Sequence, residues 1–204
     1  MNIIVLGSPG VGKGTYTQAL VEIIHLPHIS TGELFRQLAA QGNPLGVKAR
    51  DLYFGKGLLV PDEITTSLVQ ERLSQPDCQK GFILDGFPRT LAQAKALESI
   101  VPVDIVIYYR ADDNVIIHRL SGRIICRSCG KIYHTTDLLP KKEGVCDLCN
   151  GELYHRSDDD PTKIKERLDL YRKETLPLIE FYIQKGKLQE INANENFGTH
   201  RELI

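Results

Sequence analysis

The chain has 204 residues, of which 42% are hydrophobic and 25% are charged. This is the composition of a globular protein, and it excludes a disordered or fibrous chain. Lysine and arginine number 25 against 26 aspartates and glutamates, so the formal net charge is -1. A general attraction to nucleic acid or to an anionic membrane is therefore not expected, although the charge is compatible with a local basic cleft.

Short apolar runs predict the strands of a parallel sheet that is buried on both faces; they lie at residues 2–6, 82–84, 103–109 and 188–191. Helices are predicted at residues 31–41, 62–73, 90–99 and 112–121, and a longer one from Pro161 toward Lys185. Ser30 and Thr31 stand before Glu33 as in a capping box. The alternation of strands and helices predicts an α/β fold, a parallel sheet flanked by helices.

No apolar run approaches the roughly eighteen residues that a membrane-spanning helix needs. The first six residues lack the cationic region of a signal peptide. We expect a cytoplasmic monomer that acts on small molecules, without a membrane or nucleic-acid partner.

Residues 7–13 match the pattern G-x-x-x-x-G-K directly after the first predicted strand. Glycines let the backbone approach phosphate oxygens closely, at the positive end of the following helix. The candidate phosphate loop contains Gly10, Val11, Gly12, Lys13, Gly14 and Thr15. Gly14 stands where the general motif has Ser or Thr, which weakens the expectation of a direct hydroxyl bond to magnesium.

Residues 122–160 show no sustained period and are interpreted as an inserted subdomain, too small to build a core of its own. Within it, Cys126, Cys129, Cys146 and Cys149 form two C-x-x-C pairs separated by sixteen residues. Four thiolates at this spacing predict a closed, structural Zn²⁺ site. A redox dithiol or an iron site is the alternative.

Three motifs in order, GSPGVGKGT at residues 7–15, ISTGELFR at 29–36 and LDGFPRT at 84–90, resemble the adenylate kinase family of nucleoside monophosphate kinases. The likeness continues through Arg119, Arg123, the four cysteines, HRSDDD at 155–160 and Arg167. It implies reversible, Mg²⁺-dependent phosphoryl transfer from ATP to AMP, which gives two ADP. It also implies a P-loop-type core domain at 1–29, 61–121 and 160–204, an AMP-binding domain at 30–60 and a zinc-binding lid at 122–159.

The resemblance also assigns site residues. For ATP these are the phosphate loop, Arg119, Arg123, Ile132, Tyr133 and Glu195. For AMP they are Thr31, Arg36, Leu58, Leu59, Val60, Gly86, Phe87, Pro88, Arg89, Gln93, Arg156 and Arg167. Lys13, Arg89, Arg123, Arg156 and Arg167 are the expected catalytic residues, and Asp85 is expected to hold Mg²⁺ through water. Arginine suits these positions because its planar fork of donors matches phosphate.

Several of these residues also have a simpler structural interpretation. Asp85 could cap a helix or turn, Gln93 could be an exposed polar residue of a helix, and Tyr133 could pack beside the metal site. Asp158 and Asp159 either bind arginines when the lid closes or are a solvated helix start. At the level of function, the alternatives are a related kinase with another base preference and a P-loop switch or zinc protein that binds nucleic acid.

Overall fold

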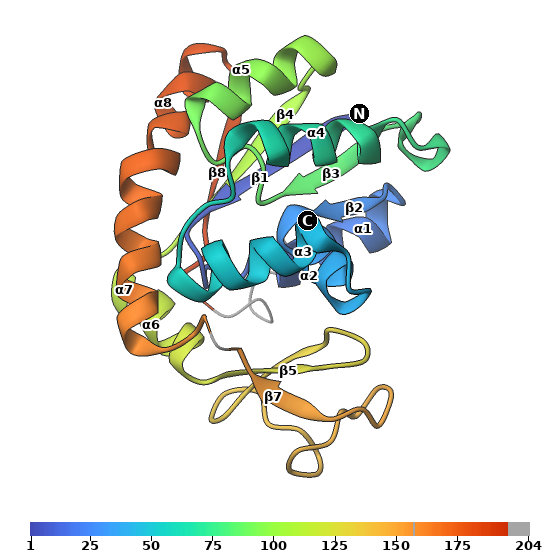
Figure 1. Cartoon of the computed structure of the whole chain (residues 1–204). Helices are drawn as coiled ribbons and strands as arrows, with labels where there is room; N and C mark the ends of the chain where they lie inside the picture. Colours follow the sequence, from blue (N-terminus) through green and yellow to red (C-terminus); the bar gives the residue numbers. More distant parts are fainter. Residues whose placement is uncertain (157, 196–204) are drawn as a thin grey trace.

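The computed structural model describes residues 1–156 and 158–195. Its centre is a five-stranded parallel sheet in the order β2-β3-β1-β4-β8 (Figure 1). The strands are β1 (Asn2–Gly7), β2 (His28–Ser30), β3 (Phe82–Asp85), β4 (Ile105–Arg110) and β8 (Leu188–Asn192). Because β1 lies between β3 and β4, the loop that follows it opens at the middle of the sheet's carboxyl edge, where open α/β sheets bind ligands.

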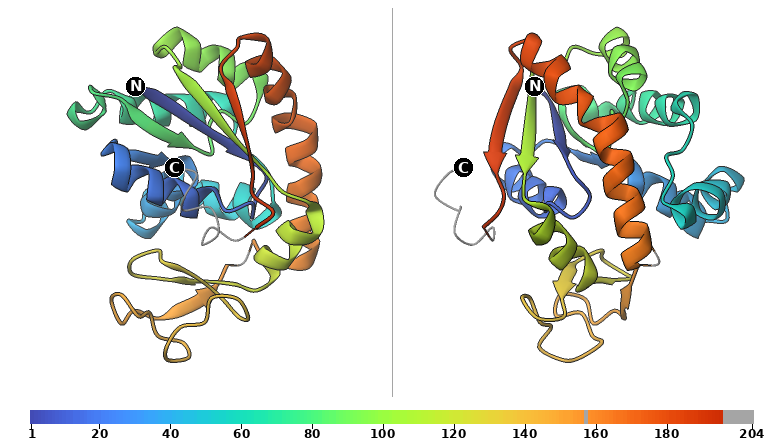
Figure 2. Two further views of the ribbon diagram at one scale, coloured as in Figure 1. Left: turned by 180° about the vertical axis from the view of Figure 1, so that it is seen from behind. Right: turned by 90° about the vertical axis from the view of Figure 1, so that its left-hand side faces the viewer.

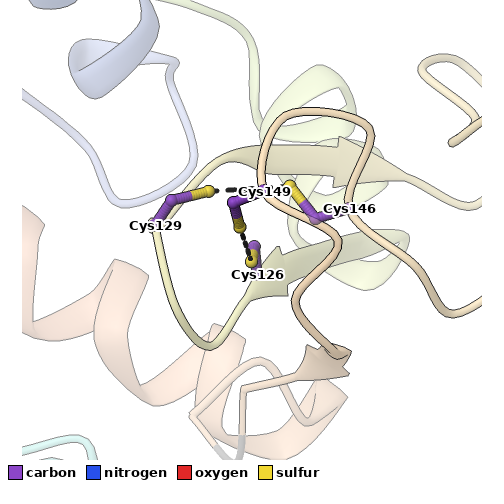
Figure 3. A group of neighbouring side chains, drawn as sticks. All are labelled: Cys126, Cys129, Cys146 and Cys149. Carbon is purple, nitrogen blue, oxygen red and sulfur yellow. Dashed lines mark hydrogen bonds between the residues drawn. The ribbon is translucent and has the colours of Figure 1, made fainter.

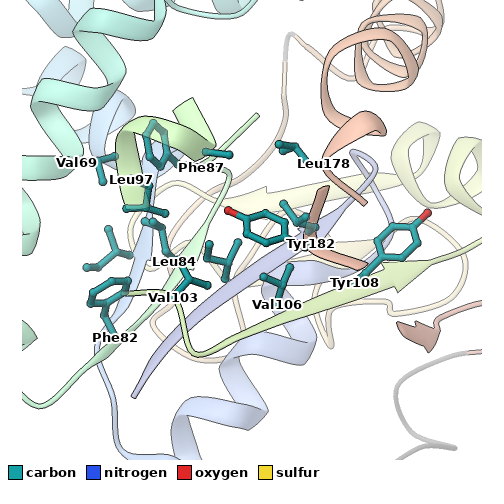
Figure 4. Packing of buried hydrophobic residues seen from close by; sticks show 14 of the residues in the cluster. Val69, Phe82, Leu84, Phe87, Leu97, Val103, Val106, Tyr108, Leu178 and Tyr182 are labelled. Carbon is teal, nitrogen blue, oxygen red and sulfur yellow. The ribbon is translucent and has the colours of Figure 1, made fainter. Parts of the chain in front are cut away.

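Successive side chains of β1 enter two different cores. Ile4 and Leu6 pack with the residues of the larger cluster, which includes Phe87, Leu97 and Tyr182 (Figure 4). Ile3 and Val5 pack on the opposite face of the sheet, with Tyr16 among others. Alternate side chains of a strand point to opposite faces, so a strand that is covered on both sides must be apolar throughout.

Helices cover both faces of the sheet (Figure 2). On one face lie α4 (Asp62–Leu73), α5 (Leu91–Ile100) and α8 (Pro177–Gln184), which contribute side chains to the larger cluster. On the other face α1 (Lys13–Ile24) contributes to the smaller one. A third cluster joins α6 (Asp113–Ser121) to α7 (Pro161–Leu170). The predicted fold class is confirmed.

The predicted strands and helices are present, with ends that differ by one or two residues, but β2 was not predicted. Its three residues contain one fully apolar side chain, Ile29, which is 2% exposed. Such a short edge strand has no sequence period, and it forms because its backbone pairs with β3, where Ile29 lies opposite Leu84.

The predicted capping box at the start of α2 (Thr31–Ala40) does not form. The Glu33 carboxylate accepts two hydrogen bonds from Arg36, at 2.6 and 2.9 Å. The Thr31 hydroxyl donates to the carbonyl of Gly86, at 2.9 Å. Ser30, the N-cap residue, makes no side-chain capping hydrogen bond. The helix begins where the pattern predicts, but the reciprocal hydrogen bonds of a capping box are absent.

The long helix predicted from Pro161 is present, but it contains a π turn at Tyr171–Thr175 between α7 and α8. The N–H of Leu176 bonds the carbonyl of Tyr171, five residues earlier, at 2.9 Å. Pro177 follows; it has no N–H, and its ring would clash with the carbonyl four residues earlier in a regular helix. The wider turn accommodates the proline within one helical run.

Residues 30–60 form a small helical segment. It contains α2, α3 (Pro44–Lys48), a π turn at Ala49–Tyr53 and a 3₁₀ turn at Phe54–Lys56. Phe35, Ala49 and Val60 form its buried centre. A further 3₁₀ turn, Pro76–Cys78, precedes β3.

The inserted segment forms a second, antiparallel sheet in the order β6-β5-β7. Its strands are β5 (Arg123–Cys126), β6 (Ile132–His134) and β7 (Leu153–His155), and they project from the main body next to the ends of α6 and α7 (Figure 1). Across the described part of the chain, the helices are too short or too polar to span a bilayer.

Candidate active site

The loop between β1 and α1 has the backbone that the glycine pattern predicts. Gly10 has φ +81°, and a Cβ there would lie 2.5 Å from Cγ of Leu120. Gly12 precedes α1 with φ 103°. A side chain at Gly10 would thus be strained by its φ and would also collide with α6. Gly14 differs, because no described atom outside its own helical turn lies within 4 Å of a Cβ built there.

Lys13 folds back over this loop. Its Nζ donates to the carbonyls of Gly7 and Ser8, at 2.8 and 2.9 Å. Burial lowers the pKa of Lys13 to about 8; Asp85 opposes this shift, and nearby arginines add to it. A phosphate oxygen that accepted these hydrogen bonds would also supply the negative charge that the buried ammonium group lacks.

Asp85 ends β3, opposite Val5 of β1 and Ser30 of β2. The His28 Nε2 lies 3.7 Å from its carboxylate. Burial pushes the pKa of Asp85 upward, but His28, Lys13 and Arg89 outweigh burial and hold that pKa below its ordinary value. The carboxylate is therefore ionised at neutral pH at the carboxyl edge of the sheet, as a ligand to a hard cation requires.

Five of the six predicted arginines gather around acidic partners between the sheet and the lid. The Arg123 guanidinium binds Asp159 through two hydrogen bonds, at 2.7 and 2.6 Å. Arg167 donates to the carbonyl of Asp158 at 2.7 Å and to Asp159 at 3.0 Å. The expected contacts of this aspartate pair with arginines are present.

Arg36 is paired with Glu33, whereas Arg89 and Arg156 are less fully paired. Arg89 donates to the carbonyl of Gly86 at 2.9 Å, and burial followed by the charge of Arg167 lowers the pKa of Arg89. Burial and the charges of Arg36 and Arg123 lower the pKa of Arg156 to about 10. The buried Nε of Arg156 finds no acceptor among the described residues. Like charges that are crowded in this way create a site for a polyanion.

Arg119 lies apart from that group. Its guanidinium donates to the carbonyls of Val11 and Ala193, at 3.0 and 2.8 Å, and to that of Glu195 at 3.0 Å. The Tyr16 hydroxyl also donates to the Glu195 carbonyl, at 3.4 Å. Arg119 thus connects the phosphate loop to residues 193–195, which follow β8 and include the predicted Glu195. The core domain predicted at residues 160–204 includes residues 196–204, which lie outside the described part of the chain.

A narrow pocket opens between the helical segment and the sheet. It is lined by Thr31, Gly32, Phe35, Phe54, Leu59, Val60, Thr65, Arg89 and Gln93, which include five of the predicted AMP residues. Phenylalanine and aliphatic side chains give it an apolar wall, and Arg89 and Gln93 add polar groups. Of the other predicted residues, Leu58 is 49% exposed and Phe87 is fully buried in the core.

Gln93 is 2% exposed, so its alternative interpretation as an exposed helix residue is wrong. Its amide oxygen accepts from the backbone N–H of Arg89 at 2.7 Å. Its amide nitrogen donates to Asp62, also at 2.7 Å. Asp62 was not singled out from the sequence, because an acidic residue directly after Pro61 is typical of a helix start. Phe35, Phe54 and Thr175 were missed as well. Phe35 lies in the motif at residues 29–36 but was not singled out there, and no motif marks Phe54 or Thr175.

The four cysteines converge (Figure 3). The Sγ atoms of Cys126 and Cys149 lie 3.4 Å apart and those of Cys129 and Cys146 3.5 Å apart. All four sulfurs lie within 4.8 Å of one another. Tetrahedral zinc with Zn–S bonds of about 2.3 Å holds its sulfurs about 3.8 Å apart, whereas a disulfide requires about 2.05 Å. The donor set fits a metal ion.

Tyr133 packs beside these cysteines. It is 2% exposed, and its hydroxyl lies 3.5 Å from Sγ of Cys146 and accepts from the N–H of Asp147 at 2.7 Å. The alternative interpretation of Tyr133, in which its side chain packs beside the candidate metal site, is therefore confirmed for the side chain. The neighbouring Ile132 is 37% exposed.

A glycine-rich phosphate loop, a buried lysine and crowded arginines at the carboxyl edge of a parallel sheet define a P-loop phosphoryl-transfer protein. The sequence model of the family "Adenylate kinase" matches residues 5–187. The chain belongs to the adenylate kinase family, whose members are phosphotransferases.

Curated adenylate kinases align with this chain over nearly its whole length. The chain is 48% identical to an adenylate kinase of Geobacillus sp. (strain WCH70), over 100% of this chain and 98% of the relative. It is 49% identical to one from Caldicellulosiruptor saccharolyticus, over 100% and 97%. It is 47% identical to the adenylate kinase of Bacillus subtilis (strain 168), over 96% and 92%.

Proposed function

We propose that this protein transfers the terminal phosphoryl group of ATP reversibly to AMP and so produces two ADP. One observation carries the proposal: the charges of Arg89, Arg123 and Arg167 act on Lys13, and Arg89 also lines the pocket with Thr31 and Gln93. An oxygen of the AMP phosphate forms a bond to the terminal phosphorus as the bond from that phosphorus to the ADP oxygen breaks. The AMP oxygen is already anionic, so the step needs alignment and charge neutralisation more than a general base.

On the donor side, the N–H groups of the loop and Lys13 hold the ATP phosphates. This donor site comprises Gly10, Val11, Gly12, Lys13, Gly14, Thr15, Arg119, Arg123, Ile132, Tyr133 and Glu195. The hydrogen bonds of Lys13 to two loop carbonyls support its part, because phosphate oxygens would replace those carbonyls. Magnesium that is bound with ATP supplies further positive charge, and Asp85 would orient its water ligands.

On the acceptor side, AMP occupies the pocket. This site comprises Thr31, Arg36, Leu58, Leu59, Val60, Gly86, Phe87, Pro88, Arg89, Gln93, Arg156 and Arg167. Lys13, Arg89, Arg123, Arg156 and Arg167 neutralise the charge of the phosphoryl group in flight. The lowered pKa values of Lys13, Arg89 and Arg156 support these roles, since each cation lacks sufficient negative charge around it until a polyphosphate binds.

Residues 30–60 and 122–159 move as an AMP-binding domain and a lid over the core, and their closure excludes water that would hydrolyse ATP. Cys126, Cys129, Cys146 and Cys149 hold a structural Zn²⁺ in that lid. The convergence of the four sulfur atoms within 4.8 Å of one another supports this metal. Its expected stoichiometry is one zinc per chain, measurable by elemental analysis. The working expectation of a cytoplasmic monomer is tested by light scattering and cell fractionation.

The test is ADP formation from ATP and Mg²⁺ with AMP, CMP, UMP or dTMP as acceptor, and with no acceptor as control. Rapid ADP formation that requires AMP supports the proposal. A preference for another monophosphate would indicate a related kinase. ATP hydrolysis that no acceptor stimulates, or no turnover at all, would contradict phosphoryl transfer and favour a P-loop switch.

A further inference from the structure

The amide of Gln93 is held by its neighbours at both ends. Nε2 donates to Oδ1 of Asp62, at 2.7 Å, and Oε1 accepts from the N–H of Arg89, at 2.7 Å. The other carboxylate oxygen of Asp62 accepts from the hydroxyl of Thr90, at 2.7 Å. Thr90 Oγ1 in turn accepts from the backbone N–H of Gln93, at 3.2 Å. Asp62 therefore links the start of α4 to the start of α5, where Gln93 lines the pocket.

These partners determine which way the amide points. An ionised carboxylate only accepts hydrogen bonds, and a backbone N–H only donates them. If the amide flipped, its oxygen would face the Asp62 carboxylate and its NH₂ group would face the N–H of Arg89. Both contacts would be repulsive, so one of the two orientations is strongly favoured.

The network also leaves a defined pattern for a ligand. A glutamine amide has two N–H donors and an oxygen with two lone pairs. One donor is used by Asp62 and one lone pair by Arg89, so one donor and one acceptor stay available. Adenine presents an amino donor beside a ring-nitrogen acceptor, and this edge pairs with the available groups. A 6-oxopurine such as hypoxanthine has a carbonyl acceptor in place of the amino group, and that carbonyl would pair well only with the flipped amide.

We propose that Asp62 is a specificity-determining residue, which locks the amide of Gln93 in the orientation that accepts AMP and rejects 6-oxopurine monophosphates. The proposal rests on the proposed function, in which Gln93 meets the acceptor base. Asp62 acts through Gln93 and is a positioning residue. Its place at the N-terminus of α4 also favours the negative charge on which the lock depends.

The test compares IMP with AMP as acceptor in the wild type and in Asp62→Asn. The substituted carboxamide both donates and accepts, so it tolerates either orientation of Gln93. We expect kcat/KM for AMP to fall and the ratio of kcat/KM for IMP to that for AMP to rise about tenfold, as is typical when one buried hydrogen-bond restraint is lost. A ratio equal to that of the wild type would overturn the proposal.

Glu63→Gln is the matched control, because it removes one negative charge from the same first turn of α4 at an exposed side chain. It should leave the acceptor ratio unchanged; a rise equal to that in Asp62→Asn would contradict the proposal. Thr90→Val keeps the carboxylate but removes the hydroxyl that orients it, and should raise the ratio by a smaller factor. A structural role alone would lower kcat/KM for both acceptors equally.

The two proposals fail in different ways. If the wild type does not phosphorylate AMP, the proposed function fails. If the wild type does so but Gln93→Ala discriminates IMP as the wild type does, Gln93 does not read the base and the Asp62 proposal is overturned while the kinase function stands.

Discussion

Individual side chains in this site are held in unfavourable surroundings that a nucleotide would relieve. Lys13 and Arg156 are buried cations with lowered pKa values, and the Nε of Arg156 lacks an acceptor among the described residues. Gly10 has a backbone conformation that other residues adopt only with strain. The energetic cost of keeping these groups is met by interactions elsewhere in the fold, as is usual at functional sites.

Lys13 leads to a prediction for pH. Its pKa is about 8 in the free protein, and bound phosphates should raise it because they favour the charged form. At pH 8 about half of the molecules carry a neutral Lys13, so ATP binding should take up about half a proton. Above pH 8 the affinity for ATP should fall as pH rises. Calorimetry in two buffers of different ionisation enthalpy measures the uptake. The same uptake in Lys13→Met would show that another group is responsible.

Gly10 leads to a prediction for stability. Gly10→Ala combines φ +81° with a Cβ 2.5 Å from Leu120, and should lower the free energy of unfolding by about 2 kcal/mol. Gly14→Ala is the matched comparison: it has open space and lies in a helix, where alanine is favoured by about 0.8 kcal/mol over glycine. Urea denaturation measures the free energy of unfolding of both variants. An equal loss of unfolding free energy in the two variants would show that the backbone conformation at Gly10 does not determine stability.

Among the helices, the run from α7 to α8 connects the inserted sheet to the neighbourhood of the pocket that Thr31 and Gln93 line. Arg167, near its start, binds Asp158 and Asp159. The π turn then presents Thr175, whose hydroxyl donates to the carbonyl of Arg89 at 2.9 Å. Arg89 is thereby held at its carbonyl by Thr175 and at its N–H by Gln93. A turn that exists because of Pro177 thus also supports an arginine of the site.

Removing that hydroxyl tests the link. Thr175→Val keeps the shape of the side chain but leaves the Arg89 carbonyl without its donor. We expect KM for AMP to rise about fivefold, corresponding to about 1 kcal/mol, with KM for ATP little changed. Thr175→Ser should restore KM. Steady-state kinetics with each substrate varied in turn provides the measurement. An equal rise for both substrates would indicate general damage to the fold.

At the scale of the whole molecule, the lid has few means of holding itself together. Its buried apolar cluster consists of Cys126, Tyr133 and Cys146, with Ile124 and Leu153 against it. So small a core contributes little to stability. The Zn²⁺ that we propose for the four cysteines would supply the missing stability. The core domain, by contrast, has a sheet covered on both faces.

Chelation should therefore act on the lid first. Removal of zinc with a strong chelator should speed hydrogen exchange in residues 123–155 while exchange in β1, β3 and β4 is unchanged. AMP affinity should stay within about twofold, because the AMP pocket lies in other elements. Exchange mass spectrometry and equilibrium binding measure the two effects, and Cys78→Ser serves as a control that leaves all four ligands intact. A parallel loss of AMP affinity would show that the lid metal also supports the core.

Local sequence patterns were sufficient to predict much of this structure. The apolar runs predicted four of the five strands of the sheet, because strands buried on both faces need a continuous apolar sequence. The cysteine spacing predicted four converging sulfurs, because two C-x-x-C pairs are a metal-ligand pattern, and the glycine motif predicted the phosphate loop after β1. Strand β2 was not predicted, because its pairing with β3 joins residues that are far apart in the sequence. The π turn was not predicted either, although Pro177 follows it closely.

The amino-acid sequence specifies the chemistry that is available: a phosphate loop, six arginines in motifs, an amide and four thiolates. Which of these groups meet follows from how the elements pack. Arg119 of α6 binds the carbonyls of Val11 and Ala193, and Asp62 of α4 binds the amide of Gln93 in α5. Such contacts join residues that lie on separate elements. They depend on how the elements pack, which no short stretch of sequence encodes.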